Sequence, residues 1–141
     1  MNTPVKFELA KLLKDKGYDK VDKENLQFYT KPNSKMFGID KHGRTYPIKN
    51  TPKKLYIVKQ HATLNPQNVY IAPTIAEVVM WLYEKHGIWI VVNVNIIGSW
   101  YFEHFDLKEK RNAQFKPTDT HYDSPTEAYE AAIEYVLTNL I

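Results

Sequence analysis

Carboxylate and imidazole side chains gather in the second half of the chain. The cluster consists of Glu103, His104, Asp106, His121, Asp123 and Glu127. Both groups are common ligands of divalent metal ions, and two of them, His104 and Asp106, are two residues apart on a predicted strand and so share one of its faces. The sequence contains no HExxH and no His-x-His pair, which a metal site would favour. We therefore predict no bound metal and no other cofactor.

Nucleophilic catalysis has no better support. The 141 residues include no Cys, which excludes disulfides, thiolate metal sites and cysteine nucleophiles. Ser34, Ser99 and Ser124 do not stand in a G-x-S-x-G elbow, and the five Gly residues form no phosphate-binding loop. We predict a protein that is not an enzyme and has no catalytic residues.

Two helices are predicted in front of the clearest strands. The first is expected to begin with Thr3 as its N-cap and to end at Gly17. The second is expected to begin at Thr74, which forms a capping box with Glu77, and to end at Gly87. Its apolar stripe is Ile75, Val78, Val79, Leu82 and Tyr83.

A third helix is predicted at the end of the sequence. It begins with Ser124 as N-cap, Pro125 at the first helical position and Glu127 two residues later. Small residues open its apolar face, so its first half can lie flat against a sheet. The predicted face is Ala128, Ala131, Ala132, Tyr135, Val136 and Leu140.

Alternating apolar residues predict strands at 88–95 and 100–105, joined as a hairpin at Gly98-Ser99. Shorter β-leaning runs are 26–30, 36–39, 44–48, 55–60 and 69–72. We expect these runs to extend the same antiparallel sheet. The predicted fold is an α+β two-layer sandwich of one domain, residues 1–141, with about three helices on one face of the sheet. Residues 1–72 supply a helix and short strands, and residues 73–141 read helix-strand-strand-helix.

Trp81, Trp89 and Trp100 could line a ligand pocket, but we expect them in the core.

Charge is distributed unequally. Residues 1–60 contain 14 Lys and Arg against 6 Asp and Glu, whereas residues 61–141 contain 5 against 10. This polarity suits self-association or a charged partner. The basic region 28–59 also has the composition of a surface that binds single-stranded nucleic acid, which we keep as an alternative function. Its candidate residues are Lys31, Lys35, Lys41, Arg44, Lys53, Lys54, Tyr29 and Phe37.

Short motifs of the chain resemble a family of small uncharacterised proteins encoded by Bacteroides-type gut bacteria and by their phages and prophages. The motifs are the helix end Phe7 to Tyr18, Ala72-Pro73-Thr74, Trp81-Leu82, His86-Gly87-Ile88, Trp100-Tyr101, Tyr122 to Ala128 and Glu130 to Ile133. The resemblance implies an accessory protein of phage or mobile-element origin, and it carries over no catalytic residue. Since residues 1–13 lack the apolar core of a secretory signal, we expect a cytoplasmic protein that binds a protein partner or itself and does not enter a membrane.

Overall fold

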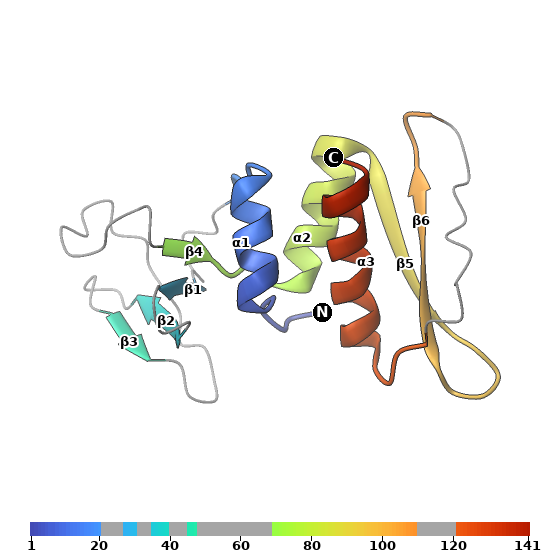
Figure 1. Cartoon of the computed structure of the whole chain (residues 1–141), viewed down its shortest axis with the longest axis horizontal. Coiled ribbons are helices and arrows are strands. Elements are labelled where there is room, and N and C mark those ends of the chain that lie inside the picture. The colour runs from blue at the N-terminus through green and yellow to red at the C-terminus, as the bar shows by residue number, and fades with distance from the viewer. Residues whose placement is uncertain (21–26, 31–34, 40–44, 48–68, 110–120) are drawn as a thin grey trace. The chain divides into compact units, whose positions relative to one another are not determined.

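The computed structural model describes residues 1–20, 27–30, 35–39, 45–47, 69–109 and 121–141, and for residues 30, 35–39 and 45–47 it describes the backbone only. The chain divides into two compact units. Pro4–Pro73 carries 14 Lys and Arg against 6 Asp and Glu, and we call it the basic unit. Met1–Thr3 with Thr74–Ile141 carries 5 against 10, and we call it the acidic unit. Both units combine helices with an antiparallel sheet, which confirms the α+β class (Figure 1).

The basic unit contains helix α1 (Phe7–Asp15) and a four-stranded antiparallel sheet. The strands are β1 (Gln27–Thr30), β2 (Lys35–Ile39), β3 (Thr45–Pro47) and β4 (Val69–Ile71), in the order β3-β2-β1-β4. Four of the predicted short strands are thus confirmed. The fifth, residues 55–60, lies outside the described residues.

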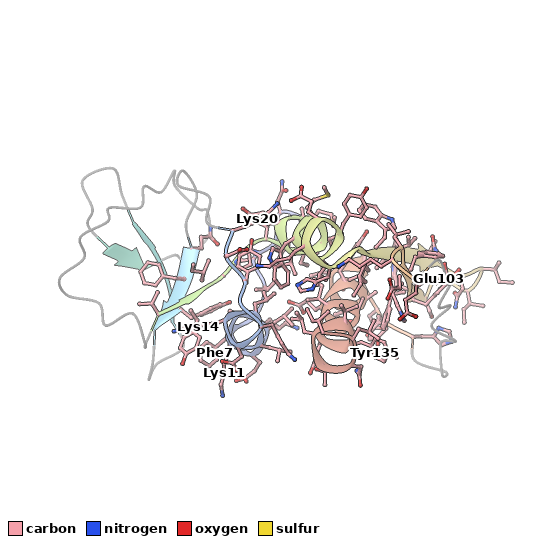
Figure 2. The ribbon with its side chains drawn as sticks, turned by 90° about the horizontal axis from the view of Figure 1, so that it is seen from above. Phe7, Lys11, Lys14, Lys20, Glu103 and Tyr135 are labelled. Atoms are coloured by element: carbon pink, nitrogen blue, oxygen red, sulfur yellow. The ribbon has the colours of Figure 1, made fainter. Side chains whose placement is uncertain are left out.

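These four strands form a sheet of their own, which corrects the prediction of a single continuous sheet with all three helices on one face. The reason lies in the contacts of α1. Its Phe7 ring meets Tyr29 of β1 and Tyr70 of β4 edge to face, at centroid distances of 5.6 and 5.3 Å. Lys14 Nζ donates to the Val69 carbonyl at 2.9 Å, and Figure 2 shows Phe7 and Lys14 together on α1. The strands therefore bury their rings against this helix within the basic unit.

The prediction that Thr3 caps the first helix is wrong, because α1 begins only at Phe7. The Thr3 carbonyl instead accepts from the Ile75 N–H at 3.0 Å, and the Met1 carbonyl accepts from the Ala76 N–H at 3.1 Å. The first N–H groups of a helix lack partners within it. Residues 1–3 supply those partners to the second helix and so cannot begin the first.

Two glycines end helices as predicted. Gly17 and Gly87 have φ angles of 78° and 72°, in the left-handed region that glycine adopts without steric cost. After α1, the Tyr18 N–H donates to the Leu13 carbonyl at 2.9 Å, the bond that defines a Schellman ending. Gly87 turns the chain directly into the next strand.

Helix α2 (Ile75–Trp81) opens the acidic unit with the predicted capping box. The Thr74 N–H donates to Glu77 Oε2 at 2.6 Å, and the Glu77 N–H donates to Thr74 Oγ1 at 3.3 Å. The helix continues into a π-helical turn, η2 (Leu82–His86). Tyr83 is exposed, although its spacing predicts a place on the buried stripe. A π turn is wider than an α turn, so it shifts the residues after Trp81 around the helix axis.

The remaining elements are strand β5 (Ile88–Val94), strand β6 (Trp100–Asp106) and helix α3 (Pro125–Asn139). The two strands form the predicted antiparallel hairpin. Ser124 caps α3 by accepting from the Glu127 N–H at 3.2 Å, and Glu127 Oε2 accepts from the Asp123 N–H at 3.2 Å. Helix α3 lies against both strands, and α2 packs beside α3 on the same side of the hairpin (Figure 1). The buried residues of α3 are Ala128, Ala132, Ile133, Val136 and Leu137.

Candidate interaction surface

The β5–β6 hairpin sorts its side chains onto two faces. On the inner face, Ile90 and Phe102 are buried, and Phe102 lies 6.2 Å from the Tyr135 ring of α3. Because neighbouring strand residues alternate between faces, the other set of residues forms the outer face. It consists of three cross-strand pairs, Trp89 with Phe105, Val91 with Glu103 and Asn93 with Tyr101. Tyr135 projects from α3 and Glu103 lies on β6 (Figure 2).

The outer face is rich in aromatic rings and partly open. Trp89 is 37% exposed, and Phe105, Tyr101 and Val91 are half-buried. Glu103 is the one carboxylate among the three pairs, and its Oε2 accepts from Asn93 Nδ2 at 3.4 Å. This face can therefore offer flat apolar area around a single negative charge.

The tip of the hairpin, residues 95–99, exposes two isoleucines. The Asn95 side chain closes the turn by accepting from the N–H groups of Ile97 and Ser99, at 3.1 and 2.9 Å. Closing the turn in this way leaves Ile96 fully exposed and Ile97 77% exposed. Exposed neighbouring isoleucines on an ordered turn are unusual in a surface that meets only water.

At the opposite end of β5 a second exposed apolar group begins. The Tyr83 ring of η2 meets the Trp89 ring edge to face, at a centroid distance of 5.5 Å. Both rings are exposed, and so is Met80 one turn earlier in α2. We call Tyr83 and Trp89 the ring pair.

Two hydrogen bonds, one at each end of the hairpin, show which backbone groups of β5 face β6. The Asn95 N–H donates to the Ser99 carbonyl, and the Leu107 N–H donates to the Gly87 carbonyl, both at 2.9 Å. Bonded and non-bonded pairs alternate along an antiparallel ladder. The odd-numbered residues of β5 therefore bond to β6, and the even-numbered residues direct their N–H and C=O groups to the other edge.

Among the described residues, nothing pairs with that other edge of β5. Its even-numbered residues are Ile88, Ile90, Val92 and Val94. No described residue hydrogen bonds to the backbone of any of the four. Natural edge strands are commonly protected by Lys, Pro or a bulge, whereas β5 has the sequence IWIVVNV with neither charge nor Pro. Within the described part of the chain, β5 thus presents an unprotected edge.

His104, a candidate of the predicted cluster, lies in the core of the acidic unit. Its side chain is 4% exposed, its ring lies 5.4 Å from Tyr135, and no described atom hydrogen bonds to its Nδ1. Burial lowers the pKa of the imidazolium, and the negative charge of Asp106 opposes that shift only in part. Burial beside the Tyr135 ring therefore favours the neutral form of the imidazole.

The other members of the cluster have separate roles. Asp106 Oδ1 accepts from the N–H groups of Lys108 and Glu109, at 3.0 and 3.2 Å, and so begins the turn after β6. His121 is exposed, with Nδ1 at 3.4 Å from Asn95 Nδ2. Among the residues that the structure describes, no three His, Asp or Glu side chains gather closely enough to hold a metal ion.

Of the candidate nucleic-acid residues, only Tyr29 has a described side chain. Its ring is 9% exposed and packs against Phe7, and its hydroxyl donates to the Val5 carbonyl at 2.9 Å. A ring held in the core in this way cannot stack on a base. Lys35 and Phe37 lie on β2, where only the backbone is described. The remaining candidates, Lys31, Lys41, Arg44, Lys53 and Lys54, lie outside the described residues.

The three tryptophans differ in environment. Trp81 is fully buried and meets the His86 ring at 4.8 Å, as predicted for a core residue. Trp100 is half-buried. The same prediction is wrong for Trp89, which is 37% exposed on the outer face. Ile96 and Ile97 were missed as candidates, although two isoleucines directly before a predicted Gly98-Ser99 turn could have indicated exposed apolar residues at the tip.

Comparison with known proteins adds no relative: no family model, curated protein or solved structure matches the chain. In the part of the chain that the structure describes, none of the helices combines the length and the apolar character needed to cross a bilayer.

Proposed function

We propose that the protein acts by binding another protein through the outer face of the β5–β6 hairpin, and that it catalyses no reaction. The proposal includes the origin and location expected from the sequence, a cytoplasmic accessory protein of phage or mobile-element descent. Its main support is the partly exposed aromatic surface of Trp89, Tyr101 and Phe105 on a hairpin whose other face is packed by α3.

The chemistry of this face favours a partner with apolar side chains and positive charge. Tyr and Trp supply most of the binding energy in many interfaces, because they bury large areas with few rotatable bonds. Glu103 lies between the aromatic pairs, in a unit with 5 basic and 10 acidic residues. A basic side chain of the partner would therefore meet an attractive field at the centre of the contact.

The test is a photo-crosslinking scan in cells that contain the natural partner. A photoreactive phenylalanine replaces Tyr101 or Phe105 on the outer face, and Thr138, an exposed residue near the end of α3, serves as the control. We expect a discrete protein adduct from the first two positions, lost when Trp89→Ser is added. The same adduct from position 138, or no adduct from either outer-face position, contradicts the proposal.

A second candidate is binding of single-stranded nucleic acid by the basic unit. The observation that favours it is the gathering of 14 of the 19 Lys and Arg residues in one compact unit. Such an excess attracts phosphate whatever the sequence of the nucleic acid. With Tyr29 in the core, stacking would have to come from other aromatic residues of that unit.

A further inference from the structure

The open edge of β5 leaves a row of backbone donors and acceptors without partners among the described residues. We propose that a second copy of this chain pairs with that edge, so that two β5 strands run antiparallel about a two-fold axis and the two hairpins form one four-stranded sheet. The proposal goes beyond the proposed function, because its hydrogen bonds come from the backbone edge of β5 and not from the outer face.

One register satisfies all the open groups. If Val91 lies opposite its own copy on the axis, then Ile90 faces Val92 of the second copy, and Ile88 faces Val94 of the second copy. All four of these residues point their N–H and C=O groups to the open edge, so each pair can exchange both hydrogen bonds. The side chains keep their faces: those of Ile90 and Val92 stay on the helix side, and those of Val91 stay on the outer side.

The same register brings together the two exposed apolar groups. They lie at opposite ends of β5, the ring pair beside its first residues and the tip directly after its last. An antiparallel two-fold places the beginning of one strand beside the end of the other. Ile96 and Ile97 of each copy would therefore reach the end of the second copy that carries Tyr83 and Trp89. The two-fold axis therefore produces this contact twice, with the tip of each copy against the ring pair of the other, as in an isologous interface.

Charge does not oppose the pairing along the strand, because β5 has no charged residue. The acidic units as a whole repel each other, since each has 5 basic and 10 acidic residues. Salt screens that repulsion, so the dimer should strengthen as ionic strength rises. A seven-residue edge with two small apolar contacts is below the roughly 1,600 Å² of a typical stable interface, so we expect a reversible, concentration-dependent dimer.

Amide hydrogen exchange distinguishes this arrangement from any other association. At low concentration the amides of Val91 and Asn93, which bond to β6, should be protected, and those of Ile90 and Val92 should exchange rapidly. At high concentration the Ile90 and Val92 amides should become protected as well. If they exchange rapidly when sedimentation shows a dimer, or if the chain stays monomeric at millimolar concentration, the proposal is refuted.

Two variants test the same edge by sedimentation equilibrium. Val92→Pro removes an N–H that points away from β6, so the hairpin keeps its own bonds while the dimer loses one on each side of the axis. Val91→Lys places two ammonium groups face to face across the axis, whereas in the monomer Lys can pair with Glu103 opposite. Each change should raise the dimer Kd about tenfold or more. Val91→Thr is the matched control and should leave Kd within about threefold.

The two proposals fail separately. If circular dichroism shows that Val92→Pro folds poorly, Val91→Lys still tests the edge pairing. Residue 91 is partly exposed in the monomer, so a Lys there should not prevent folding. If Val91→Lys leaves dimerisation unchanged, edge pairing is refuted. Crosslinks from positions 101 and 105 that still form in the otherwise wild-type chain then leave the proposed function intact. Absence of the crosslinks in the otherwise wild-type chain, together with a dimer that Val91→Lys weakens, refutes the proposed function and leaves edge pairing intact.

Discussion

Replacing His104 with Phe should make the acidic unit more stable and remove a pH dependence of its stability. His104 is 4% exposed, and no described atom bonds to its Nδ1. An unsatisfied buried polar atom costs about 1–3 kcal/mol. Phe has a similar shape and can keep the contact with Tyr135, now at 5.4 Å. We therefore expect His104→Phe to raise the free energy of unfolding at pH 7 by about 1 kcal/mol or more.

The pH dependence follows from the direction of the pKa shift. Burial lowers the pKa of folded His104 below its ordinary value of 6.5, so between those two values the unfolded chain binds more protons than the folded chain. The contribution of His104 to stability is therefore complete above pH 6.5, and it is lost as the pH falls from 6.5 to the folded pKa. One proton limits the slope to about 1.4 kcal/mol per pH unit.

Urea unfolding from pH 7.5 to 5, followed by the fluorescence of the Trp residues, measures this slope. The wild-type chain should lose stability more steeply than His104→Phe over this range. His121→Gln, which replaces an exposed imidazole, serves as the control. Parallel curves for wild type and His104→Phe would refute the argument, and so would a folded His104 pKa above 6.5 by NMR titration.

Three further predictions concern caps, a tyrosine and the basic unit. Thr74→Ala should lower the free energy of unfolding by about 1 kcal/mol, whereas Thr74→Ser should lower it by much less, since the hydroxyl accepts from the Glu77 N–H; urea unfolding compares the two. Burial, and secondarily the charge of Glu134, raise the pKa of Tyr122 above 10.0, so the free energy of unfolding should fall as the pH rises past 10. Tyr122→Phe should reduce that loss in a series of unfolding measurements at alkaline pH. If the basic unit binds single-stranded nucleic acid, the affinity for a labelled oligonucleotide should fall steeply between low and high salt, and an unchanged or absent affinity at low salt excludes that function.

The capping and turn residues made most of the acidic unit predictable. Thr74 with Glu77, Ser124 with Pro125, and Gly98 each specify a local hydrogen bond or backbone angle, and all three features are found in the structure. Such local chemistry does not depend on the rest of the fold.

The errors occurred where the local sequence pattern does not determine the structure. Thr3 could have capped the first helix, but its carbonyl bonds to the Ile75 N–H, which is 72 positions later in the sequence. Tyr83 follows the apolar spacing of an α-helix, but the π turn shifts it outward. The separate sheet of the basic unit depends on Phe7 meeting Tyr29 and Tyr70, a contact that no local pattern specifies.

The candidate surface was only partly predictable for a related reason. Alternation predicted which side chains share a face of the hairpin, but it does not tell which face the helices cover. The contacts of Tyr135 with Phe102 and His104 settle that question, and they place Trp89 on the open side.

Hydroxyl-radical footprinting of the outer face tests the central claim most directly. The oxidation rates of Trp89 and Tyr101 are measured in dilute purified protein and in cells that contain the natural partner, with exposed Leu140 at the end of α3 as the internal reference. We predict that Trp89 and Tyr101 are oxidised several-fold more slowly in the cells, while Leu140 keeps its rate. Equal rates for all three residues in both settings would contradict the claim that this face of the hairpin binds a protein.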